Sequence, residues 1–146
     1  MKDNLEQQIE DEEGRVAYAY QDSEGFWTIG VGCMVDHRKG GGLRPDEIDY
    51  ILKNRIAEAR VGILSLVPWV IDLDVCRQDA LINMAFQLGP AGVSKFGAML
   101  MALHVHDWQK AHDEALDSLW AKQTPSRAKR VAMQLLTGEY QWKQKS

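Results

Sequence analysis

The chain has 146 residues, of which 45% are hydrophobic and 26% are charged, and its formal net charge is -4 at pH 7. This length can bury a sizeable core, and this composition excludes a disordered chain. The excess of acids argues against binding to nucleic acid, which needs a basic surface. No apolar run approaches the ~20 residues of a membrane span. The polar N-terminus also lacks a signal peptide, so we expect a protein held in a cytoplasm, without stable membrane insertion.

The first third of the chain predicts a short helix, a β-hairpin and a loop. Two apolar residues four positions apart in residues 3–13 indicate an amphipathic helix, and Gly14 is typical of a helix end. Aromatic and β-branched residues alternate on both sides of residues 22–25, which predicts a hairpin turn there. Residues 35–44 include three consecutive glycines and predict a flexible loop.

The rest of the chain predicts helices. The expected helices cover residues 45–66, 75–88, about 94–104, 107–118 and 125–136. Pro45 suits the start of the first of these, and Asp74 and Thr124 are candidate N-caps. Gly138 is placed to close the last one. The expected fold class is therefore α+β, mostly α, with a small N-terminal sheet.

Two carboxylates and a hydroxyl lie on the predicted N-terminal elements. Glu13 ends the first helix, Asp22 lies at the hairpin turn, and Thr28 lies on the second strand. This set suits glycoside hydrolysis, in which one carboxyl protonates the leaving oxygen and another carboxylate activates water. However, Glu13 also ends a run of four acids, which is typical of a solvated acidic face. The residues alone leave both interpretations open.

Residues 13–32, EGRVAYAYQDSEGFWTIGVG, resemble the catalytic signature of the phage-type lysozymes, the muramidases related to the T-even phage enzyme. That signature is Glu, eight residues, Asp, five residues, Thr, and then Ile-Gly-x-Gly. Residues 83–96 and 120–131 resemble two further stretches of this family, and Thr-Gly-x-Tyr at 137–140 agrees with its C-terminal end.

The resemblance implies a lysozyme-like fold with a cleft between a small β lobe and a larger helical lobe. We therefore expect residues 1–146 to form a single lysozyme-like domain. Its β lobe would cover about 14–44 and its connecting helix about 45–66. The helical lobe would combine residues 1–13 with 67–146.

The resemblance also implies hydrolysis of the β-1,4 bond between N-acetylmuramic acid and N-acetylglucosamine. Glu13 would be the general acid, while Asp22 and Thr28 would position the attacking water. The family is inverting, which predicts carboxyl groups roughly 6.5–9.5 Å apart. Arg127 matches the arginine that pairs with the catalytic glutamate. An arginine lowers the pKa of a nearby carboxyl, so we expect Arg127 mainly to orient that group.

Five residues match family positions that contact substrate or lie near the catalytic glutamate. Phe86 and Gln87 match a cleft-lining pair, and Met34 matches a cleft aliphatic residue. Gln123 and Thr124 match positions near the glutamate. For Phe86 and Met34 the alternative is core packing, and for Thr124 it is a helix cap.

The chain departs from the family pattern in two places. Cys33 stands where the family often has histidine after Ile-Gly-x-Gly, so an ion pair made by that histidine would be absent. The stretch between Thr28 and Asn83 is shorter than in the T-even enzyme, which predicts a reduced β lobe. Cys33 and Cys76 lack the spacing of a metal site, and we expect free thiols.

The remaining histidines and tryptophans allow further alternatives. His104, His106 and His112 could be zinc ligands, but without a matching fourth ligand we expect surface histidines and no metal. Trp27 is a candidate sugar contact. Four tryptophans are expected as core anchors: Trp69, Trp108, Trp120 and Trp142.

Taken together, these observations predict a monomeric phage endolysin that acts on peptidoglycan glycan strands without metal or organic cofactor. It would stay in the cytoplasm of a Gram-negative host until a holin opens the inner membrane, and would then act at the periplasmic peptidoglycan layer. Two alternatives stay open. One is a tail-associated lysozyme used for phage entry, and the other is a catalytically silent lysozyme-fold module that binds the wall.

Overall fold

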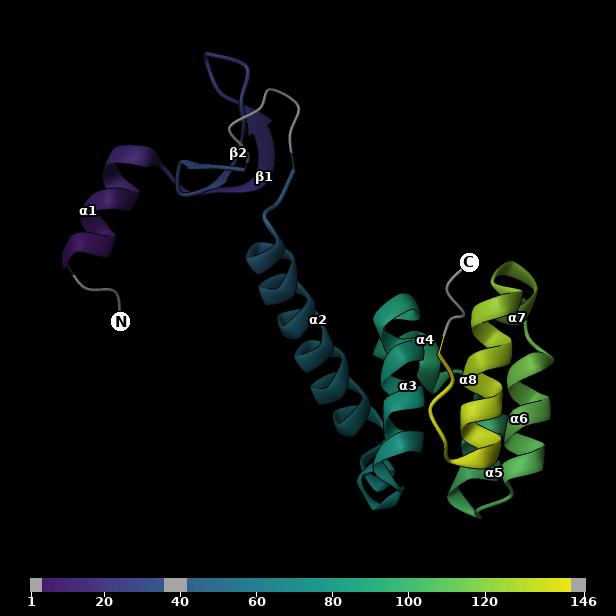
Figure 1. The fold of residues 1–146 in the computed structure, drawn as a ribbon. Helices are drawn as coiled ribbons and strands as arrows, with labels where there is room; N and C mark the ends of the chain where they lie inside the picture. Colours follow the sequence, from purple (N-terminus) through teal and green to yellow (C-terminus); the bar gives the residue numbers. More distant parts are fainter. Residues whose placement is uncertain (1–3, 36–41, 143–146) are drawn as a thin grey trace. The chain divides into compact units, whose positions relative to one another are not determined.

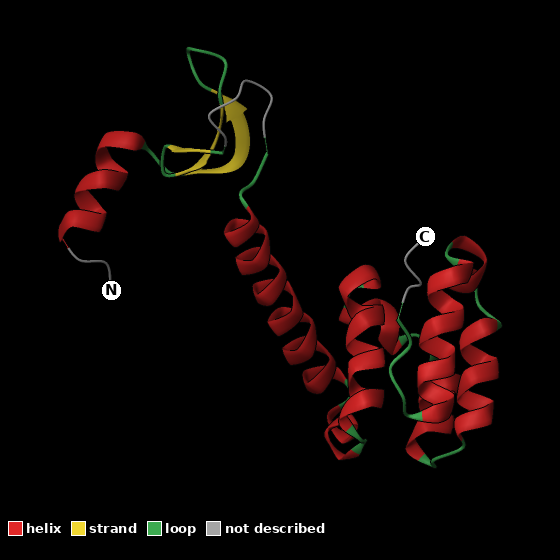
Figure 2. Ribbon diagram, viewed as in Figure 1, coloured by secondary structure: helices red, strands yellow, loops and turns green. Residues whose placement is uncertain are grey.

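The computed structural model describes residues 4–35 and 42–142. The chain divides into two compact units, Met1–Leu52 and Lys53–Ser146. Figure 1 traces the chain through both units, and Figure 2 shows that the strands lie in the first unit whereas the second is helical. The fold class is α+β and mostly α, as the sequence predicts. The finer assignment of residues to a β lobe, connecting helix and helical lobe stays a prediction.

The first unit contains a short helix and a three-stranded antiparallel sheet. Helix α1 covers Asn4–Glu13, and the strands are β1 (Val16–Gln21), β2 (Trp27–Gly30) and β3 (Cys33–Met34). The strand order is β1-β2-β3. Gly14 ends α1 with a φ of 79°, and its N–H donates to the Glu10 carbonyl at 2.8 Å. This confirms the predicted helix end. Residues 36–41 of the predicted glycine loop lie outside the described residues.

The register of the sheet places Thr28 at its centre. Thr28 on β2 lies opposite Tyr20 on β1 and opposite Met34 on β3. Residues directly opposite each other in neighbouring strands have neighbouring side chains. The hairpin between β1 and β2 confirms the predicted turn. Strand β3 was not predicted, because two residues are too few to show an alternating pattern.

The second unit consists of helices. Helix α2 (Pro45–Leu66) begins in the first unit and ends in the second. It is followed by a short 3-10 helix, η1 (Pro68–Asp72), and then by α3 (Val75–Leu88), α4 (Pro90–Ser94), α5 (Gly97–His104), α6 (Trp108–Leu116), α7 (Leu119–Gln123) and α8 (Pro125–Thr137). Helix α3 packs against α4 and α8, and α6 packs against both α5 and α8. None of the helices in residues 4–35 and 42–142 has the length and apolar character that a membrane crossing requires.

Helix α3 supplies much of the core of the second unit. Ala80, Leu81, Met84 and Ala85 are buried, and Leu88 is partly buried and packs against the core. Burying a side chain the size of Leu81 contributes about 1.5–3 kcal/mol relative to leaving it exposed. The core therefore fixes the face of α3 that carries the remaining, more polar positions.

The helix ends follow the sequence signals with one exception. Asp74 caps α3, because its Oδ2 accepts from the Arg77 N–H at 3.0 Å. Gly138 ends α8 in the left-handed conformation, with a φ of 70°. Thr124 occupies the N-cap position of α8 but makes no side-chain cap. Its hydroxyl instead donates to the Trp120 carbonyl at 3.0 Å. This carbonyl also accepts from the Thr124 N–H at 2.9 Å, because Thr124 ends α7.

Two short helices, η1 and α7, lie outside the predicted helices, and α4 overlaps a predicted helix only at its last residue. The predicted helix at about 94–104 corresponds to the end of α4 and to α5. Elements η1 and α7 each have five residues. A helical period cannot be recognised over so short a stretch, which explains why the sequence did not predict them.

Candidate active site

The carboxyl of Glu13 lies against Gly32. Glu13 is the last residue of α1, and Gly32 belongs to the turn between β2 and β3. A β-carbon built at Gly32 would lie 2.9 Å from Glu13 Cδ and 3.0 Å from Glu13 Cβ. Helix α1 and Val31 of the same turn also line a common hollow of about 350 Å³. The end of α1 therefore holds its carboxyl beside the turn that follows β2.

Asp22 is held rigidly at the turn of the first hairpin. Its Oδ1 accepts hydrogen bonds from the backbone N–H groups of Glu24 and Phe26, each at 2.9 Å. The Asp22 N–H donates to the Phe26 carbonyl at 2.8 Å, and the Gly25 N–H donates to the Asp22 carbonyl at 3.0 Å. Among the described residues Oδ2 has no hydrogen-bond partner. This carboxylate thus has one oxygen fixed and one oxygen free to accept a proton.

Thr28 is anchored by the same backbone group. Its side chain is buried, and its hydroxyl donates to the Phe26 carbonyl at 3.2 Å. Phe26 was not predicted to have a role in the site. Phe26 acts through its backbone N–H and carbonyl, which almost every residue type has. The amino-acid sequence therefore does not indicate this role.

The predicted site residues divide between the two units. Glu13, Asp22, Thr28 and Met34 belong to the first unit, and Phe86, Gln87, Gln123, Thr124 and Arg127 belong to the second. The expected pair of Arg127 with Glu13 joins residues of different units and stays a prediction. The carboxyl separation expected for an inverting enzyme also stays a prediction.

Arg127 on α8 is bound to Asn83 on α3. Its Nε donates to Asn83 Oδ1 at 2.9 Å, and its Nη2 donates to the Asn83 carbonyl at 3.0 Å. Burial lowers the pKa of Arg127, and the nearby charge of Arg130 lowers it further. The three residues line a hollow of about 270 Å³. Asn83 therefore orients the guanidinium, a role that the sequence analysis did not assign.

Phe86 and Met34 do not belong to the cores of their units. Phe86 is 45% exposed and Met34 is 41% exposed. Gln87 is held in place, because its Oε1 accepts from the Trp120 indole N–H at 2.9 Å. The core-packing alternative for Phe86 and Met34 thus finds no support within either unit.

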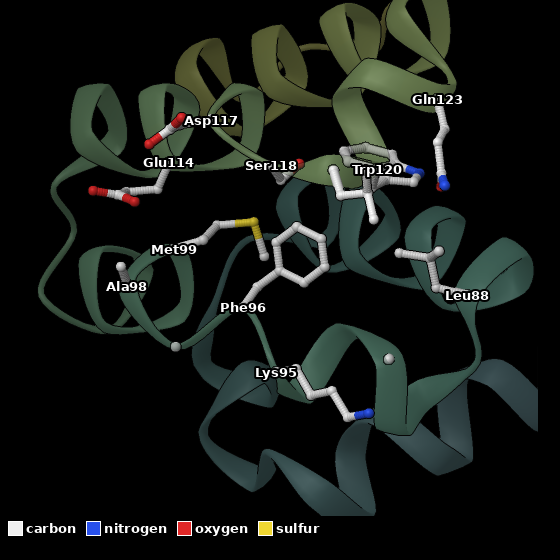
Figure 3. Close-up of a pocket in the computed structure, with 13 residues that line it drawn as sticks. Leu88, Lys95, Phe96, Ala98, Met99, Glu114, Asp117, Ser118, Trp120 and Gln123 are labelled. Carbon is white, nitrogen blue, oxygen red and sulfur yellow. The ribbon is translucent and has the colours of Figure 1, made fainter.

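Gln123 lines a larger hollow in the second unit, with a volume of about 490 Å³. Figure 3 shows Phe96 in the middle of this hollow, with Glu114 and Asp117 on one side and Gln123 on the other. The rings of Phe96 and Trp120 meet edge to face, with centroids 6.1 Å apart. The hollow combines an aromatic centre with acidic and amide groups.

The histidines pack against other side chains. His104 stacks on Trp69, and His106 stacks on Trp108, with ring centroids 4.7 Å and 4.8 Å apart. His112 pairs with the neighbouring Asp113 carboxylate at 2.8 Å. Within residues 4–35 and 42–142 no group of three or more histidine, cysteine or acidic side chains is arranged to hold a metal ion.

The tryptophan and cysteine predictions have mixed outcomes. Trp120 is buried, but Trp142 is 82% exposed, so the expectation that it anchors the core is wrong. Trp142 follows the end of α8 and stacks on Tyr140 rather than on the core. Cys33 and Cys76 are free thiols, exposed and buried respectively. Burial raises the pKa of the Cys76 thiol.

A model of the phage lysozyme family matches residues 10–136, which include the hairpin with Asp22 and Thr28 as well as α3 and most of α8. This chain belongs to the phage lysozyme family. Membership supports glycoside hydrolase activity of the lysozyme type.

Three proteins that are similar in sequence align with most of this chain. This chain is 32% identical over 160 aligned residues to the pre-baseplate central spike protein Gp5 of Enterobacteria phage T4. The alignment covers 92% of this chain and 28% of the spike protein. This chain is 27% identical to probable T4-type lysozyme 1 and 28% identical to probable T4-type lysozyme 2, both of Dictyostelium discoideum. These two alignments span 164 residues, 94% of this chain and 96% of each relative.

Proposed function

We propose that this protein is a muramidase that hydrolyses the β-1,4 bond between N-acetylmuramic acid and N-acetylglucosamine in peptidoglycan. The observation that carries this proposal is the position of Glu13. Its carboxyl lies against Gly32, in the turn that follows the strand of Thr28. Asp22 lies on the hairpin that contains the same strand. Family membership supports the same activity.

Glu13 acts as the general acid in this proposal. It transfers its proton to the glycosidic oxygen as the bond from that oxygen to the anomeric carbon breaks, and the sugar alcohol leaves. A water molecule attacks the anomeric carbon from the opposite face and gives its proton to Asp22. Configuration at that carbon is inverted, and the two carboxyl groups then need a separation of roughly 6.5–9.5 Å to admit the water.

The hydrogen bonds of Asp22 and Thr28 support their role in positioning water. Because the Thr28 hydroxyl donates its proton to the Phe26 carbonyl, its lone pairs are left to accept a hydrogen from water. Asp22 keeps Oδ2 for the other hydrogen, since Oδ1 accepts from the backbone. Both side chains are bonded to the backbone of Phe26, which reduces the freedom lost on reaching the transition state.

Six further residues are proposed to act with Glu13, Asp22 and Thr28. Arg127 orients the catalytic carboxyl, with Asn83 holding its guanidinium. Contacts to the glycan strand are proposed for five residues: Met34, Phe86, Gln87, Gln123 and Thr124. The exposure of Met34 and Phe86 agrees with such contacts.

In its biological setting we propose a monomeric endolysin that lyses a Gram-negative host. It would be held in the cytoplasm until a holin opens the inner membrane and would then reach the periplasmic peptidoglycan layer. The two Dictyostelium relatives, of which the chain covers 96% each, are named as probable T4-type lysozymes, which supports a lysozyme activity. Immunodetection in infected cells before and after holin action tests this localisation.

A tail-associated lysozyme is the second candidate. The match to the central spike protein of phage T4 favours it, although the chain covers 28% of that relative. Mass spectrometry of purified phage particles separates the two settings. A tail component is present in the particle in a fixed copy number, whereas an endolysin is found only in the lysate.

The bond cleaved can be identified from the new reducing end. Digested peptidoglycan is reduced with borohydride, and the products are analysed for muramitol or glucosaminitol. The muramidase proposal requires muramitol. Glucosaminitol would indicate cleavage of the other glycosidic bond, and the absence of both would favour the catalytically silent wall-binding module. Proton NMR of the first anomer formed tests inversion.

A further inference from the structure

Two glycines with positive φ lie where β2 passes into β3: Gly30 is the last residue of β2, and Gly32 lies in the turn that follows. Gly30 has a φ of 71° and Gly32 a φ of 62°. Residues with a side chain enter this left-handed region at a cost, so the backbone alone explains why both positions are glycine. The surroundings of the two glycines are different. A β-carbon at Gly30 would meet nothing within 4 Å.

A β-carbon at Gly32 would meet Glu13. Its three nearest atoms would be Oε2, Cδ and Cβ of that one side chain, with Cδ at 2.9 Å and Cβ at 3.0 Å. Real β-carbons do not approach other atoms this closely, so the Glu13 side chain occupies the space that a substituent at Gly32 would need.

We propose that Gly32 is a positioning residue for Glu13: the missing β-carbon makes the space that fixes the carboxyl beside the β2–β3 turn. The catalytic meaning of this inference rests on the proposed role of Glu13 as general acid. The helix end is itself fixed, because Gly14 closes α1 and Arg15 pairs with Glu10 at 2.6 Å. A substituent at Gly32 is therefore accommodated by rotation of the Glu13 carboxyl, together with a shift of a few tenths of an ångström at Glu13 Cβ.

The test compares Gly32→Ala with Gly30→Ala, which introduces similar backbone strain without the contact. We expect both variants to lower Tm by similar amounts, since the flexible end of Glu13 can turn away. Displacing a catalytic group by about 1 Å can cost about a hundredfold in rate. We therefore expect kcat of Gly32→Ala to fall about a hundredfold below that of Gly30→Ala, with KM for peptidoglycan unchanged. Equal kcat values in the two variants would overturn the proposal.

A second pair of variants separates the effect of backbone strain from the effect of the contact with Glu13. Asparagine enters the left-handed region more readily than alanine. Gly32→Asn and Gly30→Asn therefore carry less strain but keep the same difference at the β-carbon. The kcat gap between these two should match that of the alanine pair. A gap that disappears with asparagine would show that backbone strain, not the contact with Glu13, caused the loss.

A measurement without substrate separates this inference from the proposed function. In protein labelled with carbon-13 at glutamate Cδ, the Glu13 signal is assigned by its loss in Glu13→Gln. We expect this signal to shift in Gly32→Ala and to stay in place in Gly30→Ala. If the wild-type protein hydrolyses no peptidoglycan but the shift is seen, the positioning inference holds and the muramidase proposal fails. An unchanged signal in Gly32→Ala overturns the inference, whatever the activity.

Discussion

The side chains of Asp22 and Thr28 are hydrogen bonded to the backbone of the same residue, Phe26. The Phe26 N–H donates to Asp22 Oδ1, and the Thr28 hydroxyl donates to the Phe26 carbonyl. The Asp22 N–H donates to that carbonyl as well. A residue between the two side chains thus sets their positions through its backbone, and it ties the turn of the hairpin to the centre of the sheet.

Removing the Thr28 hydroxyl should reduce activity more than stability. Thr28→Val keeps the shape but loses the bond to the Phe26 carbonyl, which still accepts from Asp22. We expect about 1 kcal/mol less stability and a kcat lower by about a hundredfold. Thr28→Ser is the matched control and should keep most of the activity. A fully active Thr28→Val variant, measured on purified peptidoglycan, would contradict the proposed role of the hydroxyl.

Asp22 should be replaceable by asparagine for folding but not for catalysis. Asp22→Asn keeps an oxygen that can accept from Glu24 and Phe26, and asparagine makes the same turn. It cannot take up a proton from water, so kcat should fall by about 10²–10⁴. Asp22→Ala should lose both the activity and the turn. Urea unfolding and kcat of the two variants check this, and equal stability losses would show that the bonds to Oδ1 matter little.

The bond from Arg127 to Asn83 should depend on the shape of the guanidinium. Lysine cannot donate from two fixed positions, so Arg127→Lys should lower stability by about 1 kcal/mol and reduce kcat. Asn83→Ala should have a similar effect on stability. Lys129→Ala, an exposed change on the same helix, is the control. Unfolding free energies of the double variant test the coupling, and strictly additive losses would argue against it.

The stability of the second unit should depend on pH above 10 through Tyr140. Its hydroxyl donates to Asp79 at 2.6 Å, and this hydrogen bond is the main cause that raises its pKa from 10.0 to about 12. Because the folded pKa is the higher one, the stabilisation is complete below pH 10 and is lost as pH rises toward 12. Urea unfolding of the wild type and Tyr140→Phe should therefore differ most below pH 10. A difference that grows with pH would contradict this account.

Sequence patterns predicted those parts of the fold that depend on neighbours in the chain. The end of α1 at Gly14 and the hairpin around residues 22–25 follow from local backbone preferences, and the buried face of α3 follows from helical spacing. The three candidate catalytic residues came from one short motif and a resemblance. That motif also contains Gly30 at the end of β2 and Gly32 in the following turn.

The missed features depend on contacts between distant residues or on backbone groups. The contact of Gly32 with Glu13 and the bond of Asn83 to Arg127 each join separate elements, and no spacing rule predicts them. Phe26 acts only through its peptide group. Trp142 was expected in the core because of its residue type, yet it follows the last helix and finds Tyr140 as its partner.

The release of new reducing ends from purified Gram-negative peptidoglycan tests the central claim most directly. Three proteins are compared: the wild type, Glu13→Gln and Glu12→Gln. The last is the matched control, since Glu12 is an exposed neighbour in the same acidic run. We expect the wild type and Glu12→Gln to release muramic-acid reducing ends at similar rates, and Glu13→Gln to be slower by about a hundredfold or more. Equal rates for all three, or no release by the wild type, would contradict the assignment of Glu13 as the general acid of a muramidase.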